Sequence, residues 1–220
     1  ILKSYEDRNI RIDNNLIGVK VEANYEGFTL TALSGSAANS NNLREDILHA
    51  VDLQYGKFDL VKLGTTFASN LPSIEGAART TLASFRIQPS YWNFDGYAEY
   101  GVKSNKDVQS QVFHDDEWKI GEAFYGSLNF YYDVFSIVGE YKYYDNYAFT
   151  SNDGTIFYNT APSLRKEYTY QLLNRHPSPL DQSNEEGYAI EMNLNISDET
   201  ALIANYGITN TLPTSSYYQR

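Results

Sequence analysis

The residues of this chain best suited to chemistry are its three histidines and the acidic groups beside one of them. His114 stands in the stretch FHDDEW, directly before Asp115, Asp116 and Glu117. Imidazole and carboxylates can bind a divalent cation, so these four residues are the candidate metal ligands of the sequence. Adjacent residues of one loop rarely converge on a single ion, however. We therefore favour a solvated acidic loop here and predict no metal site.

The other two histidines offer little more. His176, in NRHPSP, could serve as a general base for Ser178 or Ser183, but sequence spacing does not show that they meet in space. His49 falls on the apolar face of a predicted strand and is expected to be an interfacial side chain. Phosphate-binding glycine loops, zinc-helix motifs and nucleophile elbows are absent, and cysteine is absent too. We expect no enzyme and no cofactor.

Composition restricts the class of protein further. A net charge of −11 argues against nucleic acid as a partner, because phosphate binding needs a basic surface. No apolar run approaches the roughly 18 residues of a membrane-spanning helix. The chain has 20 tyrosines and 11 phenylalanines but a single methionine, whereas a soluble core draws more on aliphatic residues.

Alternation is the main structural signal. From Tyr188 to Ile196 the even positions are almost all apolar and the odd positions are mostly polar, which is the period of a β-strand with two different faces. Such a strand could border a soluble core or a lipid bilayer. The same pattern recurs along the chain in about ten segments, which pair into hairpins. The predicted tight turns are EG, GK, FD, DV and DE, the last of which begins at Asp198.

Loop length separates these two alternatives. Between the hairpins lie long polar connections, roughly 37–46, 68–84, 105–122 and 145–187, so short and long connections alternate. Transmembrane barrels of bacteria have short turns at one rim and long loops at the other. Aromatic residues also gather at the hairpin ends, as in an interfacial girdle. We predict an all-β, antiparallel up-and-down transmembrane β-barrel, with a soluble all-β protein as the alternative.

The polar face of each predicted strand would then point into the barrel. It carries charges of both signs, which could line a water-filled path or pair into a closed polar network. The predicted lumen-lining residues are Lys20, Glu22, Asp52, Glu99, Lys103, Glu140, Lys142 and Glu191. Lys62 does not fit the alternation of its segment, which a β-bulge would explain.

Topology leads to three expectations. Residues 1–220 form one barrel domain, in which the short turns face the periplasm. The segment from Asp145 to Gly187 is exposed at the cell surface. Both chain ends would lie outside the cell, so the chain is expected to be an internal piece of a larger barrel.

Two stretches carry a resemblance to a known family. The opening LKSYEDRNIRIDNNLIGVKVE, with its "YEDR…ID…GV" element before a strand, resembles a poorly characterised outer-membrane barrel family of the Bacteroidota and their relatives. The stretch YNTAPSLRKEYTYQLLNRHPSPLDQSNEEGYAIE is similar to a loop and the following strand of that family. The resemblance implies a larger outer-membrane barrel. It implies no established activity and no catalytic residues.

Three classes of function remain open at this stage. The first is a pore or transport protein of the outer membrane, and the second is a membrane-embedded component of an envelope assembly. The third is a barrel enzyme of the phospholipase or protease type, which would need a converging set of catalytic side chains. The expected partners are outer-membrane lipid and, through the long loops, other envelope proteins.

Overall fold

The described residues of the chain form one antiparallel sheet of ten strands. The structure, a computed structural model, describes residues 16–38, 46–58, 60–72, 79–105, 120–151, 154, 156–159, 164, 184–197 and 199–212. The strands are β1 (Leu16–Tyr25), β2 (Phe28–Ala37), β3 (Asp46–Phe58), β4 (Val61–Pro72), β5 (Thr80–Tyr91), β6 (Phe94–Asn105), β7 (Gly121–Tyr132), β8 (Phe135–Asp145), β9 (Asn184–Ser197) and β10 (Thr200–Thr211).

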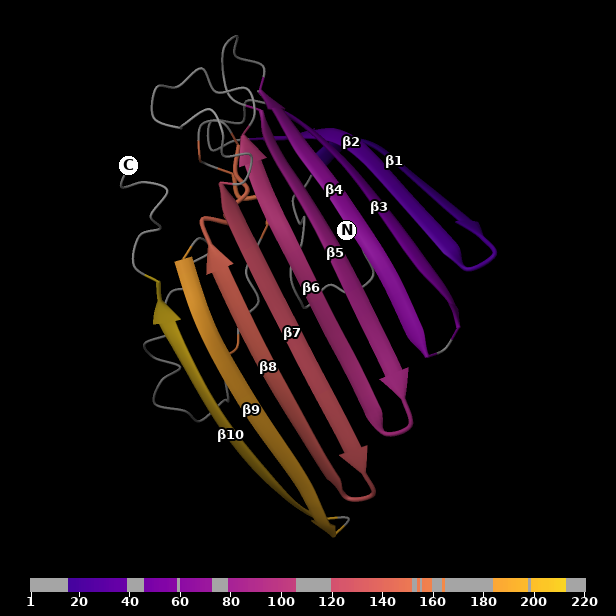
Figure 1. The fold of residues 1–220 in the computed structure, drawn as a ribbon, viewed down its shortest axis with the longest axis vertical. Helices are drawn as coiled ribbons and strands as arrows, with labels where there is room; N and C mark the ends of the chain where they lie inside the picture. The colour runs from indigo at the N-terminus through magenta and orange to yellow at the C-terminus, as the bar shows by residue number, and fades with distance from the viewer. Residues whose placement is uncertain are drawn as a thin grey trace.

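Each strand pairs only with its neighbours in sequence, in the order β1 to β10. The sheet curls, so that β1 and β2 lie behind the middle strands, and the tight turns share one end (Figure 1). This up-and-down arrangement confirms the predicted fold class. Across the described part of the chain, β1 and β10 make no contact with each other, so the curl is open. The same residues include no helix long and apolar enough to cross a membrane.

The two faces of the sheet differ in chemistry. On β9 the even positions Tyr188, Ile190 and Met192 are 43–44% exposed, whereas Glu185 and Gly187 on the other face are buried. We call the face that bears the exposed large apolar side chains the outer face and the opposite one the inner face. The alternation continues through the registers of β2 to β10, which place apolar partners opposite apolar partners on the outer face.

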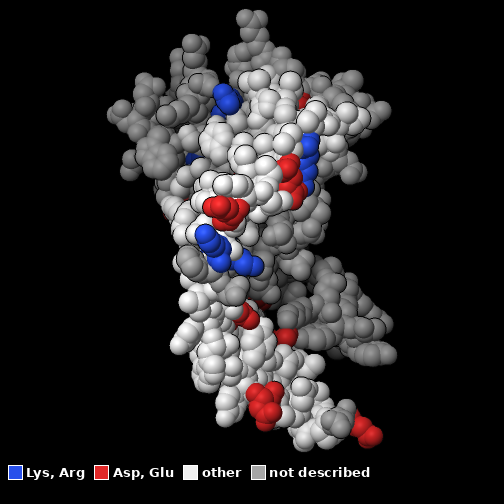
Figure 2. All heavy atoms as spheres, turned by 90° about the vertical axis from the view of Figure 1, so that its right-hand side faces the viewer, with Lys and Arg blue, Asp and Glu red and all other residues white. Residues whose placement is uncertain are grey.

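Aromatic rings gather on the outer face near the tight turns. Phe28 and Tyr55 approach to 4.5 Å between ring centroids, and Phe94 lies 4.7 Å from Phe130 on the neighbouring strand. Trp92, in the turn between β5 and β6, is 73% exposed. Amphipathic rings of this kind favour a membrane–water interface. Figure 2 shows one side of the molecule, on which the acidic and basic side chains lie in small groups among uncharged residues.

The tight turns contain residues that adopt positive φ. Glu26 and Gly27, with φ of 45° and 87°, form the two-residue turn between β1 and β2, where the left-handed region matches the twist of the strands. The turn predicted at Asp133 is also confirmed, with φ of 48°. The turn predicted at FD is wrong by two residues: it lies at Trp92 and Asn93, and β6 already begins at Phe94.

The turn predicted at Gly56 and Lys57 is also wrong. β3 continues to Phe58, and its pairing with β4 shifts between Tyr55 and Phe58. An extra residue in one strand of a pair produces such a shift, which is a β-bulge. Lys62 pairs with Gln88 and lies on the inner face. It fits the alternation of β4, because this strand begins at Val61, after Phe58 and Leu60.

Candidate functional site

A buried ion pair of the inner face joins β3 to β5. The guanidinium of Arg86 binds the carboxylate of Asp52 through two parallel hydrogen bonds, of 2.6 Å to Oδ2 and 2.8 Å to Oδ1. The two side chains are only 1% and 5% exposed. Arginine suits this position because its planar fork matches both carboxylate oxygens. The pair therefore ties together strands that are not direct neighbours.

The strand between them makes room for this pair. A Cβ atom on Gly64 of β4 would lie 2.4 Å from Cζ of Arg86, so the guanidinium occupies the space that any other side chain would fill. Thr66 of the same strand donates a 2.5 Å hydrogen bond to Oδ2 of Asp52. Nη1 of Arg86 also donates to Oγ1 of Thr66 at 3.1 Å. The buried charges thus receive the additional hydrogen bonds that burial requires.

Carboxylates continue the polar contacts across β6 to β9. Glu99 accepts a 2.6 Å hydrogen bond from Oγ of Ser84 and a second one from the hydroxyl of Tyr97. Glu140 accepts a 2.5 Å hydrogen bond from the hydroxyl of Tyr125. Farther along, Lys142 forms a buried ion pair with Glu185. The cross-strand pairs Arg86–Glu99, Glu99–Tyr125 and Tyr125–Lys142 connect these groups into one belt.

A second feature of the inner face is the start of the connection between β8 and β9. We call the described residues between Asn146 and Asn159 the inner segment. The amide of Phe149 donates to Oδ1 of Asn159 at 2.7 Å, and Nδ2 of Asn159 donates to the carbonyl of Tyr147 at 2.9 Å. The amide of Tyr158 donates to the carbonyl of Phe149 at 2.7 Å. Hydrogen bonds therefore join the beginning of the segment, at Tyr147 and Phe149, to its end, at Tyr158 and Asn159.

The inner segment packs against the strands through its aromatic rings. Tyr147, Phe149 and Tyr158 are at most 1% exposed and form one apolar cluster with inner-face side chains. The strand residues of this cluster are Ala37, Leu48, Ala50, Ala68, Leu82, Ala123 and Tyr144. Further along the connection, Leu164 packs against Tyr97 and Tyr125. The connection thus enters the curl of the sheet.

Polar side chains of the strands also bind the inner segment. Nζ of Lys103 donates to the carbonyl of Ala148 at 3.0 Å and to Oδ1 of Asn146 at 3.3 Å. Nδ2 of Asn70 is 3.4 Å from the carbonyl of Thr150 and donates at 2.9 Å to Oδ2 of Asp46. Backbone carbonyls of the segment are therefore satisfied where they are removed from water.

These contacts correct one expectation. The sequence predicted that the segment from Asp145 to Gly187 is exposed at the cell surface, but its described residues are largely buried, including Ser151 at 5% and Leu164 at 5% exposed. The polar, turn-forming composition of the segment produced the error. The available signal was the group of aromatic residues from Tyr147 to Tyr158, which is unusual for a solvated loop.

A family model matches residues 1–219 of the chain, which is nearly all of it. The chain belongs to a family of unknown function, DUF6029. The resemblance found in the sequence is supported in its coarser form, as an uncharacterised family with a barrel-type fold. The link of this DUF6029 chain to the Bacteroidota stays a prediction. No curated protein matches the sequence.

Solved structures are similar to this DUF6029 chain in fold. A porin structure matches with a TM-score of 0.54 and 9% sequence identity, covering 91% of this chain and 58% of the porin chain. The crystal structure of OpdL from Pseudomonas aeruginosa matches with a TM-score of 0.52 and 11% identity, covering 91% of this chain and 56% of that chain. The DUF6029 chain thus spans less than two thirds of either structure. At such identities the likeness concerns the fold alone.

The eight residues predicted to line the lumen all lie on inner-face positions. Lys20 and Glu22 form an exposed ion pair of 3.2 Å on the edge strand β1, and each side chain is 49% exposed. The other six belong to β3, β6, β8 and β9: Asp52, Glu99, Lys103, Glu140, Lys142 and Glu191.

Two charged members of the belt were missed from the sequence, namely Arg86 and Glu185. Arg86 could have been found, because it alternates with apolar outer-face residues of the predicted strand. Glu185 could not, because the strand was predicted to begin after it, whereas β9 begins at Asn184. Strand ends are set by pairing with neighbours and are poorly marked in sequence.

The candidate metal and catalytic residues receive no support from the described part of the chain. His114, Asp115, Asp116, Glu117 and His176 lie outside the described residues. Within the described ranges, no group of three or more histidines, cysteines or acidic residues could hold a metal ion. His49 is exposed on the outer face of β3, as expected of an interfacial side chain.

The burial of the inner segment predicts a protected thiol at Ser151. In the folded protein, Ser151→Cys is expected to react with a polar thiol reagent more slowly than Glu26→Cys by more than about tenfold, because reagent must await local opening. Glu26 is exposed in the first tight turn, and the chain has no cysteine of its own. Both variants should react at similar rates after denaturation. Equal rates in the folded protein would contradict the burial of the segment.

Proposed function

We propose that this chain forms part of the wall of a bacterial outer-membrane channel for small hydrophilic solutes. One observation carries the proposal: the sheet has an exposed apolar outer face, whereas its inner face carries charged and hydroxyl side chains beside the apolar cluster that the inner segment covers. An apolar face of this extent is unfavourable in water and suits the hydrocarbon of a bilayer. The charged inner face suits a water-filled path on the other side.

Closure of the barrel is a second part of the proposal. Both faces of β1 and most of β10 are exposed, as expected of edge strands. In lipid, each unpaired backbone group would cost several kcal/mol, so both edges require partners. We propose that they pair with further strands of the same polypeptide in a barrel of porin size. The similar porins, of which this chain spans 58% and 56%, support this size.

The inner segment lies on the inner face and would narrow a path through the barrel. Its rings cover the apolar part of the inner face on β2 to β5, β7 and β8, while the polar belt extends from β3 to β9. A segment anchored on one wall takes up part of the space that the barrel encloses. We therefore propose that the inner segment reduces the size of solute that passes.

No comparable observation supports an enzyme or a purely structural component of the envelope. A phospholipase or protease needs a nucleophile and a base within hydrogen-bond reach. The one histidine among the described residues, His49, lies on the outer face. A purely structural envelope component would not need the charged belt. Planar-bilayer recording of the purified full-length protein tests the proposal, because the absence of ion conductance would contradict it.

Weakening the packing of the inner segment tests directly whether the segment narrows the path. The rings of Phe149 and Tyr158 pack in a tilted arrangement, with centroids 5.3 Å apart, within the buried cluster. Replacing both with alanine removes much of the apolar contact that holds the segment. We expect a larger single-channel conductance, or more frequent transitions between conductance levels. The matched control is Tyr188→Ala with Tyr206→Ala, an outer-face ring pair 6.4 Å apart, which should leave the conductance unchanged. If both pairs behave alike, the segment does not narrow the path.

A further inference from the structure

We propose that the outer face binds one membrane lipid, with a hydrocarbon chain in a notch at Gly139 and the ammonium of the head group at Glu186. The proposal rests on the membrane placement argued above and adds a binding site that a channel does not require. Gly139 lies in the middle of β8, where it pairs with Leu128 of β7 and with Ile190 of β9. We call the space on the outer side of Gly139, between these two neighbours, the notch.

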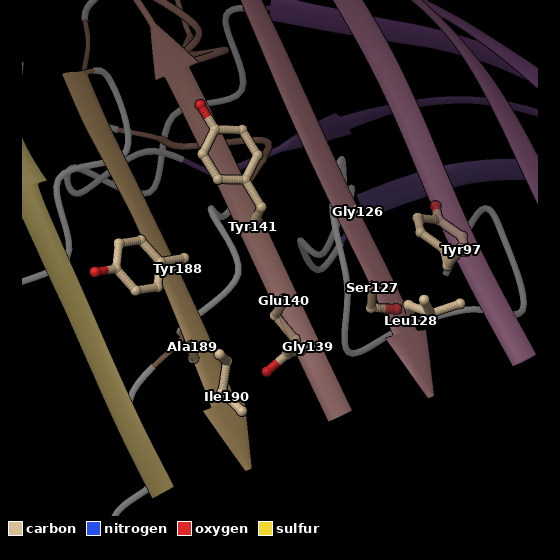
Figure 3. A pocket seen from close by; sticks show the side chains of 10 residues that line it. All are labelled: Tyr97, Gly126, Ser127, Leu128, Gly139, Glu140, Tyr141, Tyr188, Ala189 and Ile190. Atoms are coloured by element: carbon tan, nitrogen blue, oxygen red, sulfur yellow. The ribbon is translucent and has the colours of Figure 1, made fainter. Parts of the chain in front are cut away.

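The notch is open because nothing fills the place of the missing side chain. Among the glycines of the described strands, Gly139 alone has no atom, apart from its chain neighbours, within 4 Å of the position that a Cβ would take. At Gly64, by contrast, Arg86 fills the corresponding space. The hollow around the notch has a volume of about 460 Å³, and Tyr141 and Tyr188 border it on the side of the long connections (Figure 3).

The backbone of β8 gives no other reason for a glycine at this position. Gly139 does not have a positive φ, and β8 pairs with both neighbours there without a shift of register. A glycine inside a regular strand weakens the strand, and it often marks a place where a ligand approaches the backbone closely. The missing side chain is therefore explained by an occupant of the notch.

The size of the notch favours a hydrocarbon chain over a protein segment. The backbones of Leu128 and Ile190 are about 10 Å apart across β8, and their side chains take up part of that width. A helix with its side chains is about 10–12 Å wide, which is too wide to enter. A stable protein interface uses about 20–30 residues a side, many more than line this hollow. An alkyl chain is narrow, and its burial against apolar walls is favourable.

A carboxylate lies at the level expected for the head group. Oε1 of Glu186, on the outer face of β9, accepts a 2.8 Å hydrogen bond from the hydroxyl of Tyr141. Glu186 pairs with Tyr143, so along the strand it lies about 13 Å from the level of Gly139. The interfacial region of a bilayer is roughly 5–8 Å thick, so the notch lies within hydrocarbon when Glu186 lies among head groups. The carboxylate complements the ammonium of a lipid such as phosphatidylethanolamine.

The test measures the lipid that stays bound to the full-length protein after extraction from vesicles of phosphatidylethanolamine and phosphatidylglycerol with identical chains. Native mass spectrometry should show one phosphatidylethanolamine on the unaltered protein. Gly139→Leu should lower this retention about tenfold or more, because the new side chain takes the place of several methylene groups of the lipid. Ala32→Leu is the matched control, since it adds apolar volume on the outer face of β2, between Val21 and Val51, and should leave retention unchanged.

A second variant tests the head-group contact. Glu186→Gln keeps an acceptor for the hydroxyl of Tyr141 but removes the charge. The preference for phosphatidylethanolamine over phosphatidylglycerol should therefore fall by about twofold to fivefold, which is the effect of an exposed ion pair. Glu199→Gln, in the turn between β9 and β10, removes the same charge at the other end of the sheet and should leave the preference unchanged.

Three results would overturn the lipid site. The first is equal retention by the unaltered protein and by Gly139→Leu, and the second is an unchanged lipid preference in Glu186→Gln. The third is a dimer that Gly139→Leu separates, because a second copy of the chain would then occupy the notch. If Gly139→Leu does not fold, Gly139→Ala should lower retention by about twofold or more, and unchanged retention would then be the contrary result.

The lipid site and the channel function fail in different measurements. A protein that conducts but retains no lipid would overturn the lipid site and leave the channel function standing. A protein that retains the lipid as described but does not conduct would overturn the channel function and support the lipid site.

Discussion

Replacing Arg86 with methionine is expected to lower the free energy of unfolding by about 3–5 kcal/mol. The substitution leaves the carboxylate of Asp52 buried at 5% exposure after removing both hydrogen bonds of the guanidinium. A buried charge without its partner costs far more than the pair itself contributes. The measurement is reversible unfolding in detergent or lipid, compared with the unaltered protein.

Two further variants show whether the cost comes from the buried charge. Adding Asp52→Leu to Arg86→Met should recover most of the loss, since two apolar side chains leave no uncompensated charge. Lys20→Met is the matched control, because it breaks an ion pair whose side chains are 49% exposed and should cost less than about 1 kcal/mol. Similar losses for Arg86→Met and Lys20→Met would show that Arg86 and Asp52 are not buried as described.

Met192→Arg is the second large effect, with an expected loss of about 2–4 kcal/mol in lipid. Met192 lies on the outer face of β9, where its cross-strand partners are Ile137 and Ala204. A guanidinium there would have to enter hydrocarbon or displace its strand. The measurement is the free energy of folding into lipid vesicles.

The neighbouring residue provides the control for this prediction. Asn193 lies on the inner face, where Nδ2 donates to Oε1 of Glu191 at 3.2 Å. Asn193→Arg should therefore be much milder, because the new cation points away from lipid and towards carboxylates. Equal losses for the two variants would mean that the faces of β9 are assigned the wrong way round.

Local patterns along the chain were enough to predict the class of the fold and the face of most side chains. Alternation alone separated Tyr188, Ile190 and Met192 from Glu191 and Asn193, because successive side chains of a strand must point in opposite directions. Residues that tolerate positive φ, such as Gly27, located the first tight turn from local chemistry. Both signals depend on near neighbours in the chain, so no tertiary information was needed to interpret them.

Register and strand length required the tertiary structure. The turn predicted at Gly56 proved to be a bulge, because pairing with β4 carries β3 on to Phe58. Glu185 belongs to the belt for a similar reason. β9 pairs with β8 as far as Asn184 and Asp145, so Glu185 lies within the strand. Hydrogen bonding to a neighbour decides where a strand ends, and the sequence of one strand does not contain its neighbour.

The contacts on the inner face also depend on segments that are distant in sequence. Arg86 and Asp52 are 34 residues apart, and they meet because Gly64 on the strand between them has no side chain. Tyr147 and Phe149 belong to a polar connection, yet they are buried because the curled sheet presents Leu48, Leu82 and other apolar groups to them. Periodicity shows which way a strand residue points. The groups that this side chain contacts belong to segments that are distant in sequence, and folding brings those segments together.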